Sequence, residues 1–327
     1  MAAHIWIVSP ASAAANNGNW HTASRWARFL RGRHRVTLTQ QWPDDAADGA
    51  APDLLIALHA RRSAASLAAF AAAHPQRPTL LLLTGTDLYR DIHADAAAQA
   101  SLRLADALVL LQPAGLELLP AEVRAKASVI YQSAPALRPA TAPRRHFDVA
   151  MIGHLRAEKD PVTFMRAAAL LTAPHVRLIH IGAALDPALG ALAEATQAAA
   201  PRYRWLGPLA HGAARQRLKR CALMAISSLM EGGANVIIEA VSSGVAVLAS
   251  DISGNRGMLG ADYAGYFPPG DAAALAALIE RCASDAAFLA LLRRQCAARA
   301  PLFTPEAERA ALLQLVDNLL QAARRTQ

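Results

Sequence analysis

Cysteine and aromatic residues are scarce in this sequence of 327 residues: there are 3 cysteines, and aromatic side chains make up 5%. Cys221, Cys282 and Cys296 are odd in number, lie far apart, and follow no Cys-x-x-Cys or Cys/His spacing. A disulfide scaffold and a zinc site are therefore disfavoured. With so few aromatic residues, a base-stacking surface for RNA is not expected.

Long apolar runs are missing as well. No stretch of about 18 uncharged apolar residues occurs, so we expect no transmembrane helix and no membrane insertion. Met1–Pro10 lacks a basic segment followed by a long apolar core, so no secretory signal is expected and the protein is predicted to be cytoplasmic. No Gly-x-Gly-x-x-Gly follows any expected strand, which disfavours a dinucleotide-dependent oxidoreductase.

Lysine is nearly absent from the basic residues. Of the 33 basic residues, only Lys126, Lys159 and Lys219 are lysine, and the formal net charge is +8. The arginines are scattered and form no stripe, so a nucleic-acid partner is not expected. Two interpretations remain open, a solvated arginine-rich surface and a site for a small anionic substrate.

Apolar residues are abundant, at 54%, and short apolar runs alternate with helical stretches. This alternation predicts parallel sheets that are covered on both faces. The expected strands are His4–Ser9, Val36–Gln40, Leu54–His59, Thr79–Thr84, Ala107–Gln112, Val129–Gln132, Asp148–His154, Arg177–Ala183, Tyr203–Gly207, Leu223–Ser228, Val245–Ser250 and Gly265–Phe267. The expected helices are Trp20–Arg31, Ser63–Ala73, Pro161–Leu171, Ala188–Ala199, Ala213–Arg220, Asn235–Ser243, Asp271–Ser284, Asp285–Arg299 and Pro305–Arg324.

The alternation breaks at Ala134–Arg145, which is rich in proline and alanine and is interpreted as a linker. The sequence therefore predicts an N-terminal α/β domain (1–140), a C-terminal α/β domain (141–304) and a C-terminal helix (305–327) that could pack back on the N-terminal domain. Two such sheets predict a cleft at the carboxyl ends of their strands, where ligands of these folds bind.

The strongest motif runs from Glu231 to Glu239, directly after an expected strand. Gly232 and Gly233 allow the backbone to approach a ligand closely. The helix that begins at Asn235 has free N–H groups and a dipole that suit a diphosphate. Glu239 can accept two hydrogen bonds from a vicinal diol such as ribose. Taken alone, the motif fits equally well a glycine turn with two solvated glutamates.

A second motif runs from Gly153 to Pro161, after the first strand of the C-terminal domain. It contains Lys159, one of only three lysines in the sequence, close to His154 and Arg156. The plainer interpretation of Lys159 is a surface lysine at the start of a helix.

Polar residues also follow three strands of the N-terminal domain, where they could bind an anionic acceptor: Asn17, Asn19, His59, Arg61, Arg62, Thr86 and Asp87. Ordinary helix capping and helix-start surface charge are the plainer interpretations.

Residues 231–239 resemble the Glu-x7-Glu motif of retaining, family-4-like nucleotide-sugar glycosyltransferases. Ser250–Arg256 and Tyr266–Asp271 resemble further landmarks of these enzymes in the right order. The resemblance implies the α/β GT-B fold, two Rossmann-like doubly wound parallel-sheet domains facing a cleft. It places Glu231 by the donor sugar and Glu239 on the ribose, and no metal or other cofactor is expected. The diphosphate would be held by Gly18, Gly153, Gly232, Gly233, Ala234, Asn235 and Val236.

The block around Lys159 is similar to the family's Gly-Arg-Leu…Glu-Lys-Gly block. The resemblance implies that the arginine and lysine of this block neutralise the diphosphate leaving group, whose charge grows in the transition state. Lys159 matches the family lysine, whereas His154 stands where the family has arginine and Arg156 follows two residues later. Which of the two supplies the second donor stays open.

Over essentially the whole chain, the loop motifs together resemble one branch of this superfamily, the selenosugar synthases of selenoneine biosynthesis. That branch implies transfer from a UDP-sugar, UDP-GlcNAc or UDP-glucose, to selenophosphate, with formation of a carbon–selenium bond. Two alternatives are a conventional retaining GT-B glycosyltransferase with a hydroxyl acceptor, and a two-lobed nucleotide-sugar-binding protein without catalysis. The oligomeric state is not predicted.

Overall fold

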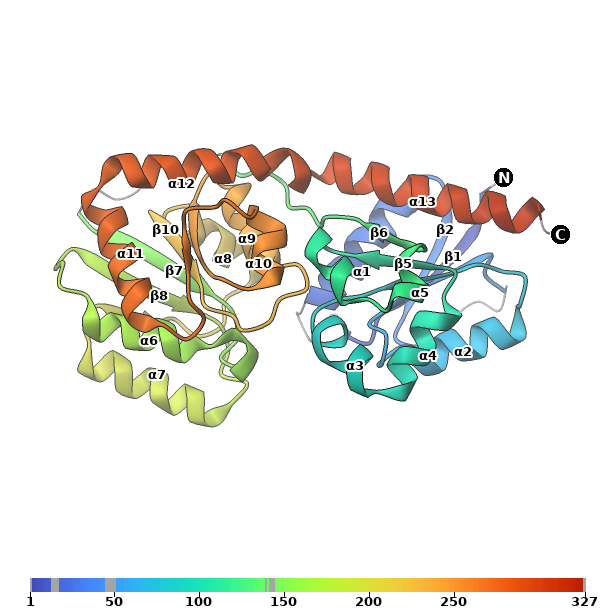
Figure 1. Cartoon of the computed structure of the whole chain (residues 1–327), viewed down its shortest axis with the longest axis horizontal. Helices are drawn as coiled ribbons and strands as arrows, with labels where there is room; N and C mark the ends of the chain where they lie inside the picture. Colours follow the sequence, from blue (N-terminus) through green and yellow to red (C-terminus); the bar gives the residue numbers. More distant parts are fainter. Residues whose placement is uncertain (1, 13–17, 45–50, 139, 141–144, 326–327) are drawn as a thin grey trace. The chain divides into compact units, whose positions relative to one another are not determined.

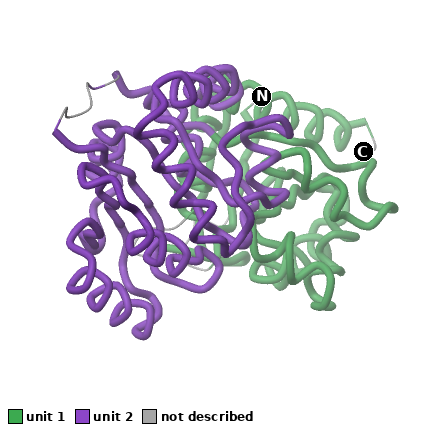
Figure 2. The backbone as a smooth tube through the Cα atoms, turned by 60° about the vertical axis from the view of Figure 1, so that its left-hand side comes forward, with its two compact units in different colours: residues 1–132, 305–327 green, residues 133–304 purple. Residues whose placement is uncertain are grey.

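The computed structural model describes residues 2–12, 18–44, 51–138, 140 and 145–325. The chain divides into two compact units (Figure 2). The first unit comprises Met1–Gln132 and Pro305–Gln327, and the second comprises Ser133–Thr304. The sequence predicts boundaries at residues 140 and 304, and the division in the structure falls at residues 132 and 304, with the C-terminal helix in the first unit. Residues 139 and 141–144 of the expected linker lie outside the described residues.

The first unit contains a parallel sheet with the strand order β2-β1-β3-β4-β5-β6 (Figure 1). Its strands are runs of mostly apolar residues, and the central ones are buried along their whole length because helices cover both faces. Strand order reverses between β1 and β3. The strands are β1 (His4–Val8), β2 (Arg35–Thr39), β3 (Leu54–Leu58), β4 (Thr79–Leu82), β5 (Ala107–Leu110) and β6 (Ala127–Val129).

The last helix of the chain, α13 (Pro305–Arg325), completes the first unit by packing against α1 (Gly18–Leu30). Its apolar stripe joins the core that lies between the sheet and α1. Glu308 is buried between the two helices and accepts hydrogen bonds from Arg25 Nε (2.7 Å) and Trp26 Nε1 (2.8 Å). The other helices of this unit are α2 (Ala64–Ala73), a π-helix (Asp87–Asp91), α3 (Ile92–Ala94), α4 (Ala96–Leu104), a 3-10 helix (Pro113–Leu118) and α5 (Ala121–Arg124).

The second unit contains a parallel sheet with the strand order β12-β11-β10-β7-β8-β9 (Figure 1). Its strands are β7 (Phe147–Ile152), β8 (Val176–Ile181), β9 (Tyr203–Trp205), β10 (Leu223–Ile226), β11 (Ala246–Ser250) and β12 (Tyr266–Phe267). Its helices are α6 (Pro161–Leu170), α7 (Pro187–Ala199), α8 (His211–Leu218), α9 (Asn235–Val241), α10 (Ser253–Leu259), α11 (Ala272–Ser284) and α12 (Ala286–Arg299), with 3-10 turns at Ala157–Lys159 and Ala300–Phe303.

Several helices begin at an aspartate whose carboxylate accepts a hydrogen bond from a first-turn N–H group, which stabilises the helix start. The capping residues are Asp95, Asp160, Asp186, Asp271 and Asp285. These caps explain why alanine-rich segments, which have weak apolar stripes, still begin at defined positions.

The predicted fold class is confirmed: both units are doubly wound α/β sheets, and each expected strand is found within three residues of its predicted bounds. The sequence does not predict α3, α4, α5 or α10, nor the short π- and 3-10 helices. Within the described ranges, no helix combines the length and the apolar character needed to cross a bilayer.

Candidate functional site

The strand order of the second unit reverses between β7 and β10, because β7 continues to β8 and β9 on one side and β10 to β11 and β12 on the other. In open parallel sheets, ligands bind outside the carboxyl ends of the strands at such a point. The loops of residues 153–160 and 227–234 leave the sheet there. Both motifs that the sequence singles out in this unit therefore meet at its expected ligand site.

Lys159 and Glu231 come together at this point. Lys159 ends the 3-10 turn, and its ammonium forms an ion pair with Glu231 Oε1. The two side chains are 18% and 9% exposed, so solvent screens the pair only weakly. An ammonium carries three N–H donors and can hold Glu231 while binding an anionic ligand as well.

Hydrogen bonds tie the two loops together. Ser227 Oγ donates to the carbonyl of Asp160 (2.7 Å), and the Leu229 N–H donates to the carbonyl of Glu158 (2.9 Å). Asp160 adopts a left-handed conformation (φ 43°) and caps α6 by accepting from the Thr163 N–H (3.2 Å). Lys159 therefore lies between two residues, Glu158 and Asp160, whose carbonyl groups are hydrogen-bonded to the loop that carries Glu231, and these bonds fix its position.

His154 and Arg156 differ in what they can offer a ligand. His154 Nδ1 accepts a hydrogen bond from the Ala183 N–H (3.1 Å), which leaves the ring proton on Nε2. Burial lowers the pKa of His154, and the positive charges of Arg156 and Lys159 lower it further. His154 is thus a neutral N–H donor at pH 7, whereas Arg156 is exposed and carries the charge.

Gly153 lies where backbones pack closely. A Cβ on Gly182, which follows β8, would lie 1.9 Å from the Gly153 carbonyl oxygen. The segments after β7 and β8 could therefore not approach each other with a larger residue at position 182. A Cβ on Gly153 itself would make only ordinary contact, 3.7 Å from Lys159 Cγ. The close approach therefore requires glycine at position 182, which the sequence analysis did not single out, and not at Gly153.

Glu239 lies in α9, which Gly232 and Gly233 precede, and Ala234 caps this helix without a side-chain hydrogen bond. Its buried carboxylate accepts a hydrogen bond from His211 Nε2 (2.6 Å). His211 begins α8, and its side chain is 48% exposed. Asn235 and Val236 open α9 and are half-buried. Glu239, the residue predicted to bind ribose, is thus already hydrogen-bonded to a histidine that the sequence analysis did not single out.

In the first unit, strand order reverses between β1 and β3, and His59 follows β3 directly. His59 has a left-handed backbone (φ 75°) and a buried ring. Its Nδ1 accepts from the Arg62 N–H (3.3 Å), so its Nε2 is the donor to Thr86 Oγ1 (3.1 Å). Burial lowers the pKa of His59, which keeps the ring neutral.

Asp87 is fully buried and joins the loops after β3 and β4. It accepts hydrogen bonds from the Ala60 N–H (2.9 Å) and from the N–H and hydroxyl groups of Thr84 (2.9 and 2.8 Å). These bonds reach both carboxylate oxygens and hold the two loops together. Contact between Asp87 and an acceptor stays a prediction.

The two neighbouring arginines differ in their pairing. Arg61 Nε donates to Asp91 Oδ2 (2.9 Å), which neutralises much of its charge. Arg62 is exposed and forms no ion pair with any residue in the described ranges. Of the two predicted acceptor cations, Arg62 is the one that the fold leaves available.

The loop after β1 is described at residues 9–12, and α1 begins at Gly18. Gly18 and Asn19 form the first turn of α1, where the Gly18 carbonyl accepts from Thr22 Oγ1 (2.7 Å). Asn17 lies outside the described residues, so its predicted role is not addressed by the structure.

Sequence reasoning missed Ser228, Asp91 and His211. Ser228 is readable in hindsight, because it is a small polar residue at the carboxyl end of a buried strand. Asp91 lies in the same segment as Asp87 but was not among the predicted residues, and His211 lies in a stretch that carries no motif. Among the described residues, no group of three or more His, Cys, Asp or Glu side chains is placed to hold a metal ion.

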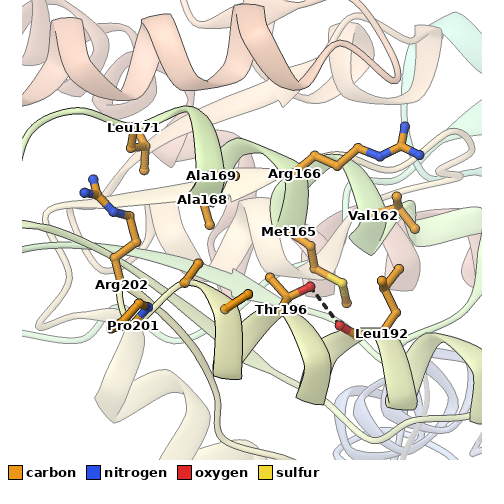
Figure 3. A pocket seen from close by; sticks show the side chains of 12 residues that line it. Val162, Met165, Arg166, Ala168, Ala169, Leu171, Leu192, Thr196, Pro201 and Arg202 are labelled. Carbon is orange, nitrogen blue, oxygen red and sulfur yellow. Dashed lines mark hydrogen bonds between the residues drawn. The ribbon is translucent and has the colours of Figure 1, made fainter.

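A hollow of about 570 Å³ lies apart from these loops, between α6 and α7 (Figure 3). Apolar side chains such as Met165 and Leu192 line it, together with Arg166 and Arg202. None of the residues that form the Lys159–Glu231 site lines this hollow.

Comparisons with known proteins agree with this arrangement. Residues 146–285 match the family model described as Glycosyl transferases group 1. No curated protein shows a significant sequence match to the chain.

The whole chain also resembles solved structures. HepE of Anabaena, solved with UDP-glucose, is 19% identical with a TM-score of 0.76, over 97% of this chain and 100% of that one. The sucrose-phosphate synthase of Thermosynechococcus elongatus is 18% identical with a TM-score of 0.78, over 98% of this chain and 100% of that one. The pneumococcal O-GlcNAc transferase GtfA is 17% identical with a TM-score of 0.64, over 82% of this chain and 57% of that one. The chain therefore has the GT-B fold of the glycosyltransferases, and most of its second unit matches the glycosyl transferases group 1 model.

Proposed function

We propose that this protein is a glycosyltransferase whose second unit binds a UDP-sugar. The observation that carries the proposal is the Lys159–Glu231 ion pair at the carboxyl ends of β7 and β10. When the bond between the sugar C1 and the diphosphate oxygen breaks, its electron pair goes to the diphosphate, and a fixed cation stabilises that charge. Proteins of the same fold have been solved with UDP and with UDP-glucose, which supports this donor class.

The other residues of the second unit fit the same proposal. Glu239 would bind the ribose diol while sharing its carboxylate with His211, because a carboxylate has about four acceptor positions. The neutral His154 would donate Nε2–H to a diphosphate oxygen, and Arg156 would add the second positive charge. The N–H groups from Gly232 to Val236 would hold the remaining oxygens.

We further propose that the acceptor is selenophosphate. A hydroxyl acceptor needs a base, but the carboxylates beside His59 are engaged: Asp87 accepts three hydrogen bonds and Asp91 pairs with Arg61 and Arg90. Burial raises the pKa of Asp91, but the hydrogen bonds from Arg90 and Arg61 outweigh it and hold the pKa below its usual value. Weak bases and exposed arginine suit an acceptor that arrives as an anion.

The proposed reaction has a simple balance. Selenium attacks C1, the C–Se bond forms, and the C1–O bond breaks with its electron pair leaving on UDP. Water then cleaves the Se–P bond and phosphate is released, which leaves a 1-selenosugar.

The test measures UDP release from UDP-GlcNAc and UDP-glucose, with selenophosphate, phosphate or sugar alcohols as acceptors, and identifies products by mass spectrometry. We expect UDP and a selenosugar only with selenophosphate, and the same turnover in EDTA. Transfer only to hydroxyl groups would instead identify a conventional retaining glycosyltransferase. UDP binding without release would identify a binding protein, and the absence of UDP binding would overturn the donor assignment.

A further inference from the structure

A chain of buried polar groups connects α10 to Glu231. Asn255 Nδ2 donates to Ser250 Oγ (3.0 Å) and to the Ser250 carbonyl (2.9 Å). Ser250 Oγ donates to the Ser228 carbonyl (2.5 Å), and Ser228 Oγ donates to Glu231 Oε1 (2.6 Å). Asn255, Ser250 and Ser228 are each 0% exposed. Water therefore cannot replace any of these bonds, and the loss of one leaves a buried polar group without a partner.

The backbone at the start of α10 supports the same carboxylate loop. A Cβ on Gly254 would lie 2.0 Å from the Glu231 carbonyl oxygen. Only glycine allows α10 to pack directly on the main chain of Glu231. Two independent contacts thus fix Glu231, one through the side-chain hydrogen bonds and one through the backbone of α10.

The bonds to the Glu231 carboxylate are also asymmetric. In the part of the chain that the structure describes, both donors, Ser228 Oγ and Lys159 Nζ, reach Oε1. Oε2 is the oxygen left to meet a ligand. A carboxylate that rotates freely would exchange the positions of its two oxygens. The hydrogen bond from Ser228 opposes this rotation and keeps Oε1 next to the Lys159 ammonium.

We propose that Ser228, Ser250 and Asn255 are positioning residues for the reaction: they hold Glu231 so that Oε2 faces the donor sugar while Oε1 keeps Lys159 aimed at the diphosphate. This inference rests on the proposed glycosyltransferase function. It adds three residues that contact neither the nucleotide nor the sugar but set the geometry of the group that does. Misplaced catalytic groups reduce turnover much more than binding.

The test compares S228A and N255A with wild type for kcat and KM with the UDP-sugar, UDP affinity by calorimetry, and Tm. Ser243 supplies the matched control, because its hydroxyl is also buried in the second unit yet finds no partner in the described ranges. We expect kcat to fall about 10- to 100-fold in S228A and N255A. KM and UDP affinity should change by less than about threefold, and S243A should match wild type.

A second measurement separates positioning from general structural damage. If Ser228 acts through Glu231, S228A introduced into E231Q should lower kcat much less than it does in wild type, because the two changes share one function. Independent, additive losses would overturn the proposal, and so would wild-type kcat in folded S228A and N255A. A parallel fall of kcat, UDP affinity and Tm would also overturn it. Absence of UDP binding or turnover in the wild type itself would instead refute the proposed function.

Discussion

Replacing Lys159 with alanine removes the cation that meets the leaving diphosphate, and we expect kcat to fall by about 10²–10³. The size follows from the burial of the pair: Lys159 is 18% exposed and Glu231 only 9%, so water replaces little of the lost stabilisation. A preorganised contact to developing charge contributes about 2.7–4 kcal/mol. At about 1.4 kcal/mol per tenfold change in rate, this corresponds to the expected loss. Affinity for the UDP-sugar should fall less, since the charge on the diphosphate is smaller before the bond breaks.

The assay for this prediction is single-turnover UDP release at saturating UDP-sugar. Lys159→Arg keeps the charge and should retain more activity than Lys159→Ala. Lys219→Ala removes a lysine at the end of α8, outside the site, and should behave as wild type. Wild-type kcat in a folded Lys159→Ala protein would refute the reasoning and shift the role to Arg156.

Three further predictions concern other residues. Glu239→Ala should weaken UDP binding by about 2–3 kcal/mol, and unchanged affinity by calorimetry would remove α9 from the nucleotide site. Arg62→Ala should raise KM for selenophosphate at least about tenfold. The increase should be larger than in Arg61→Ala, because Asp91 already neutralises Arg61. Equal KM values in both variants and the wild type would contradict this prediction. Burial lowers the pKa of His180 to about 4, below the unfolded value of 6.5, so the unfolded chain binds more protons and stability falls as the pH drops through this window. Between pH 7.5 and pH 5 this group should cost about 2 kcal/mol in the free energy of unfolding, and urea titrations of His180→Phe should show a correspondingly smaller loss.

The strands were predictable because their burial leaves a direct trace in the sequence. Leu54–Leu58, for example, is an uninterrupted apolar run that is covered on both faces. The helix α4 leaves no such trace, since Ala96–Leu104 is rich in alanine and its start depends on one capping aspartate. The π-helix Asp87–Asp91 begins at a residue whose carboxylate accepts a hydrogen bond from the Ala60 N–H in the loop after β3, and no local pattern reveals this contact.

The candidate site was predictable in its residue types and not in its pairings. Lys159 and Glu231 could be named because each stands, after an expected strand, in a motif that resembles a block of known nucleotide-sugar glycosyltransferases. The partners that determine whether a charge is free to bind a ligand come from elsewhere in the chain. Asp91 neutralises Arg61 from 30 positions away, and His211 forms a hydrogen bond with Glu239 from 28 positions away. A sequence shows that a charge is present, whereas only the fold shows how much of it remains for a ligand.

The position of α13 in the first unit has a consequence for synthesis of the chain. Trp26 and Leu30 are completely buried, yet the helix that completes their core lies at the other end of the sequence. During translation all of the second unit, up to Thr304, emerges before that helix does. The nascent first unit therefore waits with an open apolar face of the kind that chaperones bind. Proteolytic trimming or premature termination near the C-terminus would consequently damage the unit made first and spare the one made last.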